Sequence, residues 1–351
     1  MTMQADISRA PMSLPRFIAK NRLLVALITV PVLAAVVVSR ILGVPFEIDM
    51  LSWMLSLLGA VIPAFLIVLM LGRFVHLAVV VRPKRPTQTM IQDVKRVFLD
   101  ADRMLTGTAS LGLFIVFFSA FSYLKFAIPF INPFSWDVTF AEWDRALHFG
   151  IDPYRIVMGL IGTPTITTVV NLFYHGWLFL VYFAVLAACY SKADRAKAYT
   201  YLVAFVLTWF IGGNVVATLL SSAGPVYYEA LGFGGTFAPL VDTLHKFHEI
   251  SPVMALDVHQ MLWDGYVADG RARGISAMPS MHVASSALLM FYAYSWRRWA
   301  GHLLAVFCAV IMIGSVMLAW HYAIDGYLGF LIAFLCWKLA RWMVARDASS
   351  A

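Results

Sequence analysis

Long apolar runs separated by short polar stretches dominate the pattern of the chain. A helix needs about 20 such residues to cross the hydrocarbon core of a bilayer. Eight runs approach or exceed this length, and they lie at about 23–42, 51–72, 105–128, 165–188, 200–221, 279–296, 302–320 and 326–344. The pattern predicts an all-α polytopic membrane protein with about eight transmembrane helices.

Composition agrees with the apolar pattern. Of the 351 residues, 61% are hydrophobic and 13% are charged, and the mean hydropathy is +0.80. Soluble domains are about half apolar and about a quarter charged. The composition therefore excludes an ordinary soluble protein.

The net charge of +7 divides unevenly between the two sides that eight spans create. If both termini are cytoplasmic, that side holds 19 Lys and Arg against 6 Asp and Glu, and the other side holds 7 against 13. Positive residues favour the cytoplasmic loops of membrane proteins. We therefore expect cytoplasmic termini, and the basic balance is no reason to expect a nucleic-acid partner.

Two short polar segments on the opposite side are candidates for chemistry. In the first, Pro279-Ser280-Met281-His282 opens the sixth span. Proline suits the first turn of a helix, and a helix start offers free N–H groups to an anion. This segment is typical of a site that holds a phosphate beside a proton donor.

The second segment is His321-Tyr322-Ala323-Ile324-Asp325, between the last two spans. A carboxylate four residues after a histidine can contact it in a helix or tight turn, and would orient the imidazole. The 39 residues from His282 to His321 equal about two crossings of the membrane. We therefore expect both histidines at the same membrane face.

These motifs resemble those of the type 2 phosphatidic acid phosphatase superfamily. Pro279 to His282 is similar to its Pro-Ser-Gly-His type second motif, and His321-x-x-x-Asp325 matches the end of its third motif. The bulky residue before His282, the run 321–325 and the stretch from Trp143-Asp144 to Gly150 look more like its inositol phosphorylceramide synthase branch.

The resemblance covers the six spans from about 105 to 344. It implies a six-helix catalytic membrane domain at 105–344, preceded by a two-span extension with a basic cytoplasmic loop at 1–104 and followed by a tail at 345–351. It also implies that His321 is a nucleophile that forms a phosphohistidine, that Asp325 orients it, and that His282 protonates the leaving oxygen.

The chain departs from the superfamily pattern in two sequence features that hold the phosphate in its phosphatases. Its phosphatases usually carry a first motif of Lys, six residues and Arg-Pro, and an Arg six positions before the third-motif histidine. No Lys-x6-Arg-Pro occurs here, and the second position is Ser315. The missing phosphate clamp resembles the synthase branch.

Other polar residues on the same side are candidates for substrate binding, because the negative charge of a bound phosphate in a low-dielectric site needs a partner. Each has an equally simple structural interpretation as a loop charge, interfacial residue, turn or contact between helices. They are Arg271, Arg273, Ser280, Lys125, Asn171, Tyr174, His175 and Tyr227. The histidines and carboxylates of 245–269 match no metal-binding motif, so we expect neither a metal nor a cofactor.

The sequence thus predicts a membrane phosphotransferase that moves a phospho-head group, inositol phosphate-like, from a phospholipid to a lipid hydroxyl such as that of ceramide. The expected location is a bacterial inner membrane, with the site on the periplasmic face. The alternative is a lipid or polyprenyl phosphate phosphatase that uses the same histidines. A transporter is a further alternative, but its polar residues would lie near mid-membrane.

Overall fold

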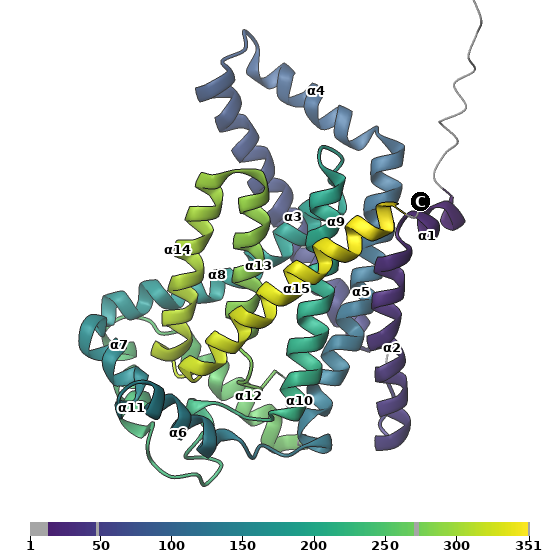
Figure 1. The fold of residues 1–351 in the computed structure, drawn as a ribbon. Helices are drawn as coiled ribbons and strands as arrows, with labels where there is room; N and C mark the ends of the chain where they lie inside the picture. The colour runs from purple at the N-terminus through teal and green to yellow at the C-terminus, as the bar shows by residue number, and fades with distance from the viewer. Residues whose placement is uncertain (1–12, 47–48, 270–273, 350–351) are drawn as a thin grey trace, which may run out of the picture.

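The computed structural model describes residues 13–46, 49–269 and 274–349, and the regular structure within these ranges is helical throughout (Figure 1). Its α-helices are α1 (Leu14–Lys20), α2 (Arg22–Leu42), α3 (Asp49–His76), α4 (Pro86–Phe98), α5 (Ala101–Ile131), α6 (Asp137–Leu147), α7 (Pro153–Ile161), α8 (Pro164–Cys189), α9 (Arg195–Phe210), α10 (Ala217–Leu219), α11 (Ala238–Ile250), α12 (Ala255–Asp269), α13 (Met281–Trp296), α14 (Arg298–Met317) and α15 (Ala323–Ser349). Two π-helical turns, Leu77–Val81 and Ile211–Val216, extend α3 and α9, and Pro225–Tyr227 forms a 3-10 turn. The predicted all-α class is confirmed.

Seven helical segments of the described chain are long and apolar enough to cross a membrane: Arg22–Leu42, Leu58–Val81, Ala101–Ile131, Pro164–Cys189, Arg195–Leu219, Arg298–Met317 and Ala323–Asp347. The protein is thus an integral multi-pass membrane protein. The remaining predicted span, 279–296, corresponds to α13, which has 16 residues. Its length of about 24 Å falls short of a hydrocarbon core of about 30 Å.

The start of α13 differs from the prediction because Ser280 caps the helix. The Ser280 Oγ accepts a hydrogen bond from the Val283 N–H at 3.4 Å, so the helix begins at Met281. Serine is a preferred capping residue because its oxygen satisfies a free N–H of the first turn. Pro279 therefore precedes the cap and does not form the first turn.

Helix α13 is the central helix of the bundle and packs against α8, α9, α14 and α15. Eight of its first nine residues are buried; the exception is His282, which is partly exposed. Protein rather than lipid surrounds this first half, which explains how a short helix is accommodated.

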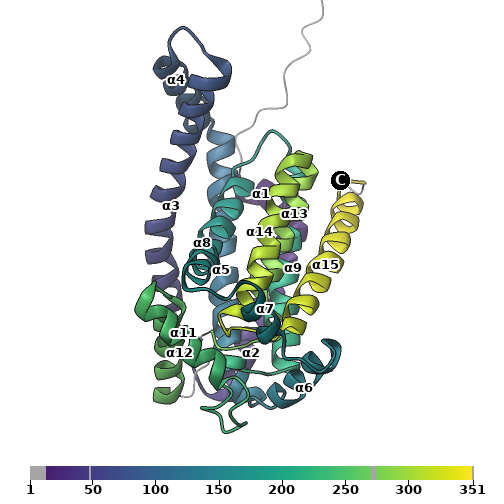
Figure 2. The same ribbon diagram turned by 90° about the vertical axis from the view of Figure 1, so that its left-hand side faces the viewer.

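Helices α2 and α3 pack against α5 on the outside of the bundle. Figure 2 shows α3 along one edge of the molecule and α15 along the other. Only 6% of the apolar window in Leu58–Val81 is buried, as expected for a helix that faces lipid on most sides.

The short helices α6, α7, α11 and α12 gather at one end of the bundle (Figures 1 and 2). They come from the stretches 129–163 and 222–278, which the charge asymmetry assigns to one side. Both histidine motifs lie at this end, because α13 begins and α15 begins there.

Candidate active site

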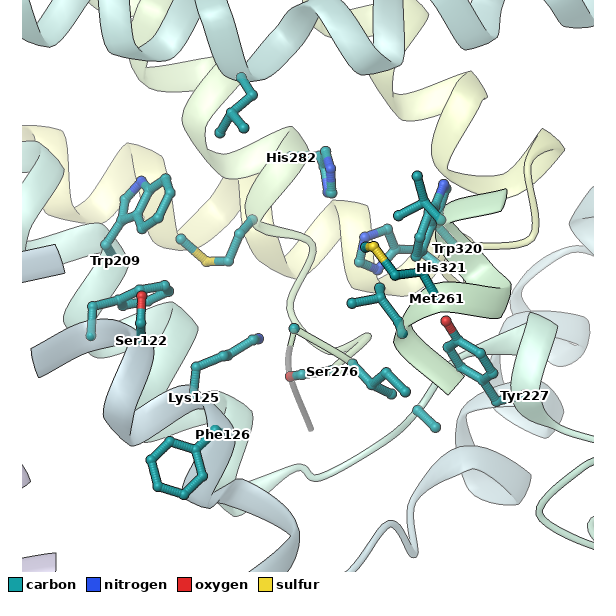
Figure 3. A pocket seen from close by; sticks show the side chains of 18 of the residues that line it. Ser122, Lys125, Phe126, Trp209, Tyr227, Met261, Ser276, His282, Trp320 and His321 are labelled. Atoms are coloured by element: carbon teal, nitrogen blue, oxygen red, sulfur yellow. The ribbon is translucent and has the colours of Figure 1, made fainter. Parts of the chain in front are cut away.

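A cavity of about 930 Å³ lies at the end of the bundle where α13 and α15 begin. Its walls come from α5, α8, α12, the start of α13 and the loop before α15, and Figure 3 shows them from close by. The lining is largely apolar and aromatic, including Phe121, Trp177, Trp209, Met261 and Trp320. Such a cavity suits a ligand with an apolar part and a small polar group.

His321 lines this cavity from the turn between α14 and α15. Its Nδ1 lies 2.8 Å from the Ala277 carbonyl oxygen and 3.3 Å from the Asp325 Oδ2. Because both neighbours are acceptors, Nδ1 carries the proton and Nε2 is the unprotonated nitrogen. Burial lowers the pKa of His321 to about 3, so the ring is neutral at pH 7.

Asp325 is fully buried at the start of α15 and contacts His321 as the four-residue spacing suggests. Its Oδ2 also accepts a hydrogen bond from the Tyr322 N–H at 3.0 Å. Its backbone carbonyl accepts from the Ser280 N–H at 2.9 Å, which ties the two histidine segments together.

His282 faces His321 from the first turn of α13. The centroids of the two rings are 5.7 Å apart, with an angle of 66° between the ring planes. Tyr174 and Trp177 of α8 hold the His282 ring, with centroid distances of 4.3 Å and 4.2 Å. Neither ring nitrogen of His282 bonds to another residue in the described part of the chain, so both can serve a ligand.

Lys125 provides a cation in the same cavity from α5. Its side chain is only 9% exposed, and it forms no hydrogen bond or ion pair with any residue of 13–46, 49–269 or 274–349. Its charge acts on both His282 and His321, and Figure 3 shows the three side chains around one space. A buried ammonium without a partner is costly, and an anion in the cavity would relieve that cost.

Two carboxylates of α6 hold the loops around the site. Asp137 accepts hydrogen bonds from the Ala223 and Gly224 N–H groups and from the Tyr322 hydroxyl, at 2.8 to 3.1 Å. Asp144 accepts from the N–H groups of residues 323 and 324, at 2.9 and 3.1 Å. Burial raises the pKa of both carboxyls, although these hydrogen bonds oppose the shift.

The two α6 carboxylates are seven residues apart and therefore lie on one face of the helix. Neither carboxylate is among the site residues predicted from the sequence. Two acidic residues at this spacing in an otherwise amphipathic helix are the signal that was available.

The structure separates the predicted substrate-binding residues into three groups. Lys125, Tyr174, His175 and Tyr227 line the cavity. Asn171 and Ser280 are fully buried and do not line the cavity. The Asn171 Oδ1 accepts a hydrogen bond from the Ala255 N–H at 3.1 Å, and Ser280 caps α13. Arg271 and Arg273 lie outside the described residues.

The sequence around Lys125 is a variant of the Lys-x6-Arg-Pro motif. Lys125 is followed by six residues and then by Asn132-Pro133, so the spacing is kept with asparagine in place of arginine. The Asn132 Nδ2 donates to the Thr218 carbonyl at 2.8 Å. Asn132 therefore anchors the end of α5, while Lys125 faces the cavity one to two turns earlier.

No group of three or more His, Cys, Asp or Glu side chains suited to a metal ion occurs among the described residues. His248 accepts from the Val253 N–H at 3.1 Å. His259 packs its ring 4.1 Å from that of Trp320, and burial lowers its pKa to about 3.

Gly329 allows the two histidine segments to approach each other. A Cβ at this position in α15 would lie 2.5 Å from the Ser280 carbonyl oxygen. We expect Gly329→Ala to push α15 away from the start of α13, which would lower stability by about 1–3 kcal/mol and reduce turnover. Thermal unfolding and activity of the purified variant would measure both effects.

Gly112→Ala is the matched control, because a Cβ at Gly112 in α5 meets nothing within 4 Å. This variant should be as active as the natural protein and equally or more stable, since alanine favours a helix by about 1 kcal/mol. Equal behaviour of the two variants would contradict the proposed role of the Gly329 contact.

A comparison with models of known protein families finds a match. The family model described as the PAP2 superfamily matches residues 138–339, which include His282, His321 and Asp325. Curated proteins and solved structures showed no match. The match begins after α5, so Lys125 lies outside it.

Proposed function

Since the chain belongs to the PAP2 superfamily, whose activities are of the phosphatase and phosphotransferase type, we propose that it transfers a phospho-head group from a phospholipid to a lipid hydroxyl. The head group is inositol phosphate-like and the acceptor is a lipid alcohol such as ceramide. The observation that carries this proposal is the cavity in which His282, His321 and Lys125 surround one space.

His321 is the nucleophile. Because its Nδ1 proton is held by the Ala277 carbonyl and Asp325, the lone pair of Nε2 attacks phosphorus. The new N–P bond forms as the bond from phosphorus to the oxygen of the departing lipid alcohol breaks. Asp325 then stabilises the imidazolium character that develops on the ring.

His282 protonates the departing oxygen, so the diacylglycerol part leaves as a neutral alcohol. In the second step, the same nitrogen takes the proton of the acceptor hydroxyl as the acceptor oxygen attacks phosphorus and the N–P bond breaks. The stacked Tyr174 ring and the tilted Trp177 ring hold His282 for both transfers.

Lys125 binds the phosphate oxygens. An ammonium at this place offsets charge in the transition state without reorganisation. Ser315 stands where the phosphatases carry an arginine, and its Oγ is already bonded to the Ile311 carbonyl at 2.8 Å. A clamp with few cations favours a phosphodiester, which carries one negative charge, over a phosphomonoester, which carries up to two.

The arrangement of charges supports an orientation in which both termini are cytoplasmic and the cavity faces the periplasm of a bacterial inner membrane. The segment 105–344 then forms the catalytic domain. Donor and acceptor both reach the site by diffusion within the membrane.

The purified protein with phospholipid labelled in its head group tests this function. We expect label to appear in a new lipid only when ceramide or diacylglycerol is present. Release of the free phospho-head group at the same rate without an acceptor, or faster release of phosphate from a lipid phosphate, would favour hydrolysis instead.

A further inference from the structure

A second charged cavity lies at the end of the bundle opposite the histidine pair. It has a volume of about 90 Å³ and is formed where α1 ends, α5 begins, α8 ends and α9 begins. Figure 1 shows α1 and the first turns of α5 at the far end of the molecule from α6 and α12. The cavity is therefore separate from the site proposed above.

Basic side chains from four separate segments line this cavity. They are Lys20, Arg103, Lys192 and Arg195, and the lining carries one carboxylate, Asp102. The neighbouring Asp100 holds the Lys192 Nζ at 2.6 and 2.7 Å. Even with both carboxylates counted, the four cations leave a surplus of two positive charges.

Arg103 is the cation of this cavity that has a buried donor without a partner in the described chain. Its Nε is buried and has no hydrogen-bond partner among the described residues, and its nearest ion-pair contact, with the Asp100 Oδ2, is long at 4.0 Å. A buried donor without an acceptor is destabilising. The planar guanidinium is suited to donate hydrogen bonds to a phosphate, whose oxygens would supply the missing acceptor.

The size of the cavity limits the ligand. At about 90 Å³ the space is small, and one phosphate group fits it. The Thr106 and Ser191 side chains also line the cavity, and their hydroxyl groups are further possible donors.

We propose that this cavity binds one phosphate group, either from the head group of an anionic phospholipid or as free phosphate. Clusters of Lys and Arg at the membrane interface recognise anionic lipids in this manner. A bound phosphate would connect α1 to α5 and α9, and so fasten the N-terminal helices to the bundle. This inference is independent of the proposed function.

The test is thermal unfolding of the full-length protein in neutral detergent with sodium phosphate, and in phosphatidylcholine nanodiscs with or without phosphatidylglycerol. Ionic strength is matched with chloride. Stabilisation by phosphate alone identifies free phosphate as the ligand, and stabilisation only by phosphatidylglycerol identifies the lipid. If neither probe stabilises the protein, the proposal is overturned.

The variant Arg103→Gln isolates this cavity from the histidine site, which it leaves unchanged. We expect the apparent affinity for the stabilising probe to fall about 10- to 100-fold, since a hydrogen bond to a charged group contributes about 1.5–3 kcal/mol. Arg103→Lys should recover part of the affinity.

Arg96→Gln is the matched control. It removes the same charge from the same end of the molecule, on α4, where the Arg96 side chain is 81% exposed and lies 3.9 Å from Asp93. Its affinity should equal that of the natural protein. An equal loss in both variants would mean that net charge, and not the cavity, attracts the probe.

Discussion

His321→Ala is expected to reduce turnover by about 10⁴-fold or more while the protein stays folded, because it removes the proposed nucleophile. His321 is 5% exposed and its Nδ1 bonds to a loop carbonyl, so alanine removes one internal hydrogen bond as well as the nucleophile. The measurement is head-group transfer from labelled phospholipid, together with the unfolding temperature of the variant.

Substrates with different leaving groups distinguish the roles of the two histidines. His282→Ala should lose about 10²–10⁴-fold with a lipid alcohol as leaving group, but recover most of this loss on a p-nitrophenyl phosphodiester, whose phenolate departs without a proton. His321→Ala should stay inactive on both substrates. If the p-nitrophenyl substrate rescued His321→Ala and not His282→Ala, the two assignments would have to be exchanged.

Lys125→Met is expected to lower kcat/KM by about 10²–10³-fold, the loss typical of removing one preorganised donor from a developing anion. Methionine keeps the length and apolar stem of the side chain, so packing in α5 should change little. The same transfer assay, with kcat and KM measured separately, reports the effect.

Two further variants make the Lys125 prediction specific. Lys125→Arg keeps the charge and should retain more activity than Lys125→Met. Lys246→Met removes an exposed lysine from α11 at the same end of the molecule and should leave activity unchanged. Full activity of Lys125→Met would show that another group binds the phosphate.

The spans and the pairing of the two motifs could be predicted because both depend on distance along the chain. Runs of apolar residues mark the helices, and the separation of His282 and His321 matches two crossings. Helix α13 makes one of these crossings with 16 residues, fewer than a helix that faces lipid needs. Hydropathy does not distinguish a helix enclosed by protein from one that faces lipid, since both are apolar.

Side-chain directions could not be predicted in the same way. Helix α5 is apolar on most of its surface, so its sequence pattern does not show which side of the helix faces the bundle. Lys125 could therefore be expected equally well at the lipid interface, and only the packing of α5 against α2, α8 and α9 turns it into the cavity. Asn171 was predicted to bind substrate, but its side chain hydrogen-bonds to the start of α12 and does not line the cavity.

The sequence by itself determined that this is a helical membrane protein, that its positive charge is concentrated at one end, and that two histidines and one aspartate meet at the other end. Composition and spacing are sufficient for these conclusions. Only the tertiary structure decided that the Ala277 carbonyl shares the Nδ1 proton of His321, that α6 holds the loops through Asp137 and Asp144, and that Lys125 faces both rings. These contacts join residues remote in sequence, and they depend on how each helix is rotated and how far it is shifted along its axis.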